Sequence, residues 1–286
     1  MDPTTTASSS RTTPAVHTVG VFQCFTWLAL GWKDLYRSGP ASVVHGLALA
    51  IFGAALLWVG HQRFWLLAGA FSGFLVVAPV LATSLYALSR ALERKETASW
   101  AVVGKTWLNW QDSHLNKWSN DYWCMVQFGT LLALAATGWV LTSAALVTLL
   151  SPVPVNTPLD FVRTVVLAHD NWAFEVWLAL GGILAAPMFA SSVVSMPLLL
   201  DRRISLLHAV LTSWRVVLAN PIPMAVWAAL LMVLTLLGFA SLMLGLVVII
   251  PLLGHASWHA YRDLVDSTQL PAREAYSAPY VRPGNR

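Results

Sequence analysis

Long runs of apolar residues restrict this chain to folds in which helices cross a membrane. A helix crosses the hydrocarbon core of a bilayer in roughly 20 residues. The last apolar block of the chain, at 222–262, is about twice that length. Only 10% of the 286 residues are charged, whereas soluble domains carry roughly 25%. The sequence therefore predicts an all-α integral membrane protein.

The apolar runs predict six transmembrane helices, because the block at 222–262 is long enough for two spans with a break near 238–241. The predicted spans are 40–60, 64–89, 123–150, 172–200, 222–238 and 241–262. Together they form one membrane domain at 21–265. We expect disorder in the tails at 1–20 and 266–286, because both are polar, contain prolines and lack an apolar run.

The basic residues predict the orientation of these spans. Fifteen of the 17 Lys and Arg residues lie before the first span, in the loops at 90–122 and 201–221, or from the end of the last span onward, and six spans place these regions on one side. Arg63 and Arg163 are the other two. Because loops rich in Lys and Arg stay in the cytoplasm, both termini are expected to be cytoplasmic. The net charge of +4 then indicates contact with membrane lipids and no nucleic-acid partner.

Surface helices and a repeat are also expected. Segments at 21–37, 98–117 and 203–219 mix apolar, basic and Trp residues, and they predict amphipathic helices on the cytoplasmic interface before each odd-numbered span. The even-numbered spans share a proline, then a small residue three positions on, then a polar residue. These residues are Pro79, Ala82 and Thr83; Pro187, Ala190 and Ser191; and Pro251, Gly254 and His255. The pattern predicts three pseudo-repeated hairpin units, each preceded by a surface helix.

Hydroxyl side chains gather just after these prolines. They are Thr83, Ser84, Ser191, Ser192 and Ser195. A proline frees a backbone carbonyl and permits a kink, and hydroxyl groups can satisfy the freed backbone or bond across helices. Two interpretations stay open: tight helix packing, and a polar cavity where three kinked spans meet.

Charged residues follow each even-numbered span, at 90–93, 201–203 and 261–263. Their equivalent placement predicts ion pairs that hold the cytoplasmic ends of these spans together.

Histidines provide the candidate metal ligands. His255 and His259 are four residues apart and therefore share a helix face. His45 lies at a similar predicted depth, so the three could bind zinc, copper or haem. The alternative is that the two histidines of span six anchor its end at the interface or bond to other helices. No cofactor is predicted, because no Cys or carboxylate has a spacing that would complete such a site; haem or a transition metal at these histidines is the alternative.

Two stretches resemble a known family. "GWKDLYRSGPASVVHGLALAIFG" and "IIPLLGHASWHAYRDLV" are similar to segments of the uncharacterised bacterial family called domain of unknown function 2189, described as predicted integral membrane proteins. The likeness covers about residues 26–265. It implies a bacterial inner-membrane protein and assigns no activity. Some members are labelled subunit I of cytochrome c oxidase. Such a subunit is expected to need more than six spans and more histidine ligands within them, whereas only His45, His255 and His259 lie within or at the edge of a predicted span here.

The expected function rests on the catalytic motifs that the sequence lacks and on its features typical of helix packing. The sequence contains no phosphate loop, zinc-protease motif or serine-hydrolase elbow, and no carboxylate in the middle of a span. These features favour a non-enzymatic scaffold, assembly or accessory component, with membrane lipids and other membrane subunits as partners. One alternative is a transporter or lipid-handling protein that uses the polar cavity. A second is a haem-binding or metal-binding protein linked to a respiratory oxidase.

Overall fold

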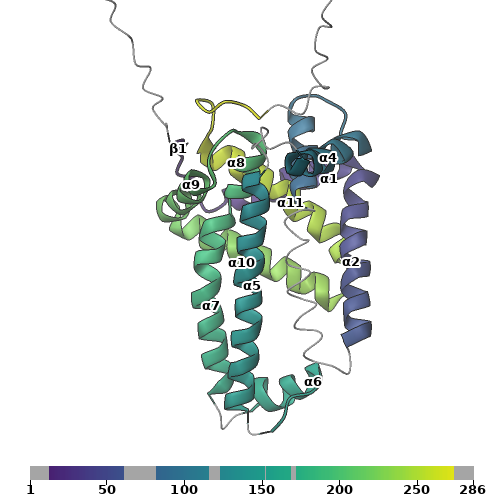
Figure 1. The fold of residues 1–286 in the computed structure, drawn as a ribbon, viewed down its shortest axis with the longest axis vertical. Helices are drawn as coiled ribbons and strands as arrows, with labels where there is room; N and C mark the ends of the chain where they lie inside the picture. Colours follow the sequence, from purple (N-terminus) through teal and green to yellow (C-terminus); the bar gives the residue numbers. More distant parts are fainter. Residues whose placement is uncertain (1–12, 61–81, 116–122, 152, 169–171, 274–286) are drawn as a thin grey trace, which may run out of the picture.

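The computed structural model describes residues 13–60, 82–115, 123–151, 153–168 and 172–273. Within these ranges the chain is mostly helical. Some of the long helices run along one axis and others cross it obliquely, and shorter helices gather at one end (Figure 1). The expectation of a helical membrane protein is confirmed.

Three described helical stretches are long and apolar enough to cross a membrane. They are α5 (Trp123–Leu150), α7 (Ala173–Ser192) continued by α8 (Ser195–Asp201), and α10 (Pro221–Ala240). A fourth candidate is the pair formed by α1 (Gln23–Ser38) and α2 (Pro40–Gly60), which meet at an angle of 104°. The described residues thus hold three to four candidate spans.

The other predicted spans have different outcomes. Much of the second, 64–89, lies outside the described residues, which show a helix only at 82–93. The sixth coincides with α11 (Leu246–Leu264), which is not among the candidate spans. The physical reason is that its second half carries two histidines and the charged Arg262, and that it packs against α1 and α2.

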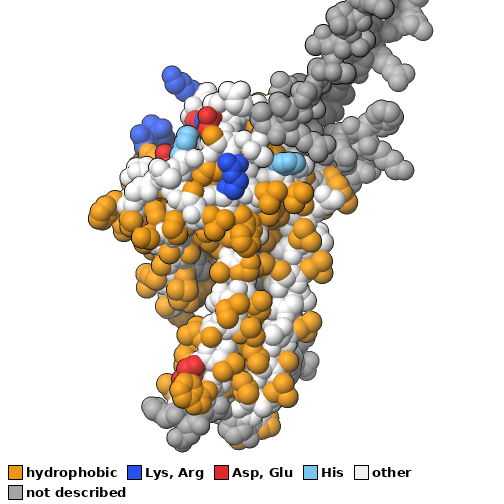
Figure 2. All heavy atoms as spheres, turned by 90° about the vertical axis from the view of Figure 1, so that its left-hand side faces the viewer, with side chains coloured by type: hydrophobic (Ala, Val, Ile, Leu, Met, Phe, Trp, Pro, Cys, Tyr) orange, Lys and Arg blue, Asp and Glu red, His pale blue; other side chains and the backbone are white. Residues whose placement is uncertain are grey.

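The surface helices gather at one end of the molecule. Helices α4 (Trp100–Leu115) and α9 (Leu206–Ala219) lie at the same end as α1 (Figure 1). The three helices correspond closely to the amphipathic segments that the sequence predicts. Lys and Arg side chains cluster at this end, whereas apolar side chains cover the length beyond it (Figure 2). This distribution fits a protein whose charged end lies in water and whose apolar length lies in lipid.

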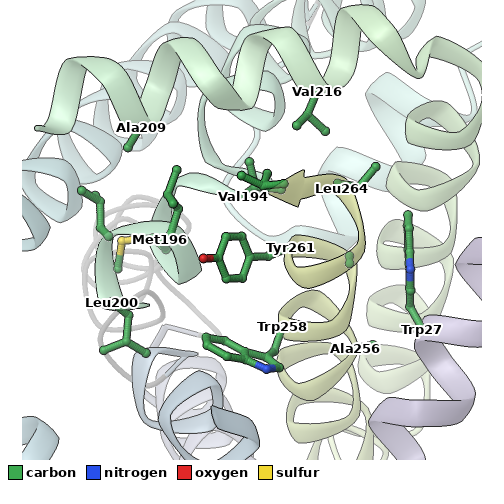
Figure 3. Close-up of a cluster of buried hydrophobic side chains, with 14 of the residues drawn as sticks. Trp27, Val194, Met196, Leu200, Ala209, Val216, Ala256, Trp258, Tyr261 and Leu264 are labelled. Carbon is green, nitrogen blue, oxygen red and sulfur yellow. The ribbon is translucent and has the colours of Figure 1, made fainter. Parts of the chain in front are cut away.

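The largest core also lies at the charged end, where α1, α8, α9, α10 and α11 meet (Figure 3). Trp27 packs edge-on against Trp227 with 5.5 Å between ring centres, and Trp258 packs against Tyr261 at 5.4 Å. Only 22% of the most apolar window of α5, and of α10, is buried. Helices α5 and α10 therefore keep most of their apolar surface for lipid, and the packed core holds the charged end together.

The described parts of both tails are ordered, unlike the disorder expected from their composition. β1 (Ala15–Val16) pairs antiparallel with β2 (Val265–Asp266). Farther along, the backbone N–H of Arg273 donates to the Asp201 carbonyl at 2.8 Å. The expected disorder therefore does not hold for 13–20 and 266–273, because their backbones find partners in each other and at the end of α8.

A capped turn joins α5 to α7 at the far end of the molecule. α6 (Pro158–Phe161) leads into the π-helical η1 (Val162–Val166). The Asp160 N–H donates to the Thr157 hydroxyl at 3.1 Å, and the Asp160 carboxylate accepts from the Thr157 N–H at 2.9 Å. These reciprocal bonds form a capping box. The hydrogen bonds with the Thr157 side chain and backbone lower the pKa of Asp160 below its ordinary value.

Candidate functional site

The two histidines of α11 lie in a polar network around Asp34. His259 Nε2 is 2.8 Å from the Asp34 carboxylate, and the Ser89 hydroxyl donates to the same carboxylate oxygen at 2.8 Å. Ser89 Oγ is also 2.7 Å from His255 Nδ1. Because α1 supplies Asp34 and the helix at 82–93 supplies Ser89, the network joins α11 to two helices that are distant in the sequence.

Serines at the junction of α1 and α2 hold the second ring nitrogen of His255. Ser42 Oγ is 2.8 Å from His255 Nε2, and Ser38 Oγ is 2.6 Å from Ser42 Oγ. The Ser38 hydroxyl donates to the Asp34 carbonyl at 2.6 Å. His255 has no exposed surface. Both its ring nitrogens therefore have partners inside the protein, as a buried polar side chain requires.

The third candidate ligand, His45, makes a local contact instead. Its Nδ1 donates to the Ala41 carbonyl, one turn back in α2, at 2.6 Å. Within the part of the chain that the structure describes, no group of three or more His, Cys, Asp or Glu side chains could hold a metal ion. A metal at His255 would have to displace its hydrogen bonds to serine. The metal site at His45, His255 and His259 stays a prediction, and the geometry favours interhelical hydrogen bonding.

Two of the candidate hydroxyl groups connect α4 to the helix at 82–93 and α9 to α7. The indole N–H of Trp107, on α4, donates to Ser84 at 2.8 Å. The indole N–H of Trp214, on α9, donates to Ser191 at 2.9 Å. In both pairs the Trp follows the Ser by 23 residues. The same contact therefore recurs, with Ser84 in place of the expected Thr83.

Two of the remaining candidate hydroxyl groups are buried between helices, and the third lines a cavity. Thr83 is buried, and Ser195 is buried and donates to the Ala209 carbonyl at 3.2 Å. Ser192 donates to the Met188 carbonyl at 2.8 Å and also lines a cavity between the helices. Of the five candidates, only Ser192 lines that cavity. A polar cavity lined by these five residues together stays a prediction.

The cavity itself is mainly apolar and has a volume of about 340 Å³. Its walls come from the helix at 82–93 and from α5, α7, α8, α10 and α11. Leu132, Ala136, Phe189 and Met196 are among the apolar side chains that line it. Its polar groups include the hydroxyls of Tyr86 and Ser257, which hydrogen-bond to each other. Sites for small molecules typically start at about 300 Å³ and are mostly apolar, with few polar groups.

Ion pairs join the ends of the helix at 82–93, α8 and α11. Arg262, on α11, pairs with Glu93 at 2.9 Å, and Arg94 lies 3.9 Å from Asp201 at the end of α8. The Tyr261 hydroxyl donates to the Asp201 carboxylate at 2.9 Å. Figure 3 shows this hydroxyl pointing towards the helix of Met196 and Leu200. The predicted ion pairs are present, and one of their carboxylates is buried.

Sequence reasoning did not find Asp34, although a signal for it exists. Trp27, Gly31, Asp34 and Ser38 recur at helical spacing on one face of α1, and all four are buried. This periodicity could have placed the carboxylate on the packed face. It could not have named Ser89 as the partner, because nothing in a sequence pattern says which helix covers that face.

Comparison with known proteins agrees with this picture. Residues 66–201 match the model of a family described as "Predicted integral membrane protein (DUF2189)". No match was found among curated proteins or among solved structures. The matched segment ends at Asp201, so the likeness seen in α11 lies outside it. The family resemblance predicted from the sequence is thereby confirmed over residues 66–201, which match the predicted integral membrane proteins called DUF2189.

Proposed function

We propose that this chain is a non-catalytic, lipid-handling protein of the bacterial inner membrane that holds an apolar molecule in its central cavity. The cavity of about 340 Å³ carries this proposal, because several helices line a partly open apolar space with few hydroxyl groups. The acyl chain of a membrane lipid suits such a space, since burial of each CH₂ group contributes about 0.8 kcal/mol. The bilayer around the helices supplies this molecule.

The proposal includes six spans in three hairpin units, with both termini in the cytoplasm. Helix α11 then forms a short sixth span whose polar half stays within the protein. The recurring Trp–Ser contacts of α4 and α9 support the repeat, since each ties a surface helix to the even-numbered span before it. The clustering of basic side chains at one end supports the orientation.

A static holding role fits the ion pairs better than transport does. A transporter that rocks one unit against another must break the contacts between them. Here Asp201 and Glu93 tie the ends of three helices together, and Asp201 is buried. Breaking a buried charged pair costs several kcal/mol. This cross-linking also favours the second candidate, a rigid scaffold or accessory subunit for other membrane proteins.

Filling the cavity tests the lipid-handling role. Ala136→Phe places a ring in the cavity, whereas Ala135→Phe, one residue earlier, places the same ring on the exposed side of α5. Native mass spectrometry of the purified protein measures the bound lipid. We expect the wild type and Ala135→Phe to retain lipid and Ala136→Phe to lose it, with similar melting temperatures. Equal retention by the folded Ala136→Phe variant would refute the role.

The scaffold candidate is tested on the same preparations. Cross-linking in native membranes before extraction should yield a partner in a fixed ratio to this chain, and the Ala136→Phe variant should keep it. Recovery of the chain without a fixed partner, but with lipid, contradicts the scaffold and supports the lipid-handling role.

A further inference from the structure

The charge of the central cavity, whose volume is about 340 Å³, restricts what the cavity can hold. Among the described residues that line it, none is Asp, Glu, Lys, Arg or His. The two histidines of α11 have partners elsewhere, since His255 contacts Ser89 and His259 contacts Asp34. Burial of a phosphate or carboxylate without a charged partner is strongly unfavourable. The described wall of the cavity therefore favours an uncharged ligand.

The hydroxyl groups of the wall use their protons within the protein. Ser192 donates to the Met188 carbonyl and Ser257 donates to the Leu253 carbonyl, both at 2.8 Å. A hydroxyl group has one proton to donate, and its oxygen can also accept. Because the proton of Ser257 goes to Leu253, Tyr86 is the donor in the hydrogen bond between Tyr86 and Ser257. The oxygens of the wall are thus left to accept a hydrogen bond from a ligand.

An indole adds a donor to the same wall. Trp227, on α10, lines the cavity and is almost fully buried, with 1% of its surface exposed. Its indole N–H donates a hydrogen bond to no residue in the described part of the chain. An indole can donate but not accept, and a buried donor without a partner is unfavourable. A ligand that supplies an acceptor would remove this cost.

A hydroxyl group is the uncharged group that matches such a wall, because it both donates and accepts. An ether or an ester oxygen only accepts, and the end of an acyl chain does neither. The apolar part of the wall, which includes Leu132 and Ala136, suits the alkyl chain of the same molecule. We propose that the central cavity binds an uncharged lipid alcohol, such as diacylglycerol, whose hydroxyl group donates to the Tyr86 oxygen. This inference rests on the proposed lipid-handling function and names the head group of the lipid.

The test compares three probes that share one alkyl chain: decanol, decyl methyl ether and ionised decanoate. Native mass spectrometry of the purified protein in detergent measures how much of each probe binds at equal concentration. Binding that the Ala136→Phe variant retains is subtracted, because its filled cavity leaves only partition into the detergent. We expect the ether to bind about fivefold less than decanol, which is the loss of one hydrogen bond. Decanoate should bind at least roughly tenfold less, because its charge has no partner.

Two tyrosine variants test the contact itself. Tyr86→Phe keeps the aromatic ring and removes the oxygen, so it should bind the ether like the wild type and lose the preference for decanol. Tyr36→Phe is the matched control, because Tyr36 lies on α1, is 86% exposed and does not line the cavity. It should keep the full preference. Equal weakening of all three probes in Tyr86→Phe would assign the residue a structural role only and overturn the proposal.

Other outcomes separate this inference from the function on which it rests. If the wild type binds the ether or decanoate as well as decanol, the head group is not recognised and the proposal is overturned, while the lipid-handling role stands. The same conclusion follows if Tyr86→Phe keeps the full preference for decanol. If none of the probes binds the wild type more than it binds Ala136→Phe, the lipid-handling role fails together with the proposal.

Discussion

Replacing Asp201 by alanine should destabilise the charged end of the protein more than any change to a surface carboxylate. The Asp201 carboxylate is buried and accepts hydrogen bonds from the Tyr261 hydroxyl and from Arg202 Nε, both at 2.9 Å. Asp201→Ala leaves these donors, and the guanidinium groups of Arg94 and Arg262, without their shared negative charge. The helix ends that the carboxylate joins should then separate more easily.

The expected magnitude follows from these contacts. Removing one partner of a buried ion pair costs about 3–5 kcal/mol. Arg94 is 41% exposed, so its contact adds little, and the Tyr261 hydroxyl keeps a second partner, Ser267, at 3.0 Å. We therefore expect the free energy of unfolding to fall by about 3 kcal/mol. In a chain of this size that corresponds to a decrease of roughly 6–12 °C in Tm. Tyr261→Phe, which removes one hydrogen bond to a charged group, should cost about half as much.

Thermal unfolding of the purified protein in detergent, followed by tryptophan fluorescence, measures this decrease. Glu175→Gln is the matched control, because Glu175 is an exposed carboxylate in the first turn of α7, far from Asp201 in the structure. Its Tm should stay within about 2 °C of the wild type. The reasoning is refuted if Asp201→Ala melts with the wild type, or if Glu175→Gln melts as early as Asp201→Ala.

Three further predictions concern other parts of the chain. Gly46→Ala should lower stability by about 1–3 kcal/mol, because its new Cβ would overlap the backbone of α11, whereas Gly104→Ala, in open space, should not; thermal unfolding compares them. Metal analysis and visible spectra should find the wild type colourless and metal-free, and the same should hold for His255→Ala and His259→Ala; bound iron, copper or zinc lost in either variant would contradict this. Hydrogen bonds with Thr157 lower the pKa of Asp160. The contribution of the ionised Asp160 cap to stability should therefore be complete above the ordinary carboxyl pKa and be lost only as the pH falls through the lowered pKa. An NMR titration of Asp160 measures this pKa, and a midpoint at or above the ordinary value would contradict the prediction.

Apolar run length predicts the long helices well in this chain. Helix α5 begins and ends at the residues expected for the third span, and α2 coincides with the first. The chain also turns between α10 and α11 near the expected break, where Leu242 and Met243 have positive φ. These features could be predicted from the sequence because a helix in lipid must form all its backbone hydrogen bonds within itself. The composition and length of a segment therefore decide whether that segment forms a helix in the membrane.

The candidate site shows what local patterns leave open. Spacing placed His255 and His259 on one face, which is correct for a helix, but the partner on that face is Asp34. Asp34 and Ser89 come from other helices, and the ring nitrogens that a metal would need are bonded within the protein. A pattern of residues gives the face of a helix, whereas the packing of several helices decides which groups meet there.

The sequence by itself determined that this chain is a helical membrane protein, where its long helices run, and that charged residues would pair at the ends of the even-numbered spans. Only the tertiary structure decided that the hydroxyl groups are mostly used in packing, that the tails pair through β1 and β2, and that α11 lies against α1 and α2. The physical reason is that the insertion of an apolar helix into the bilayer depends on the length and composition of that segment alone. Hydrogen bonds, ion pairs and cavities depend instead on segments that only folding brings together.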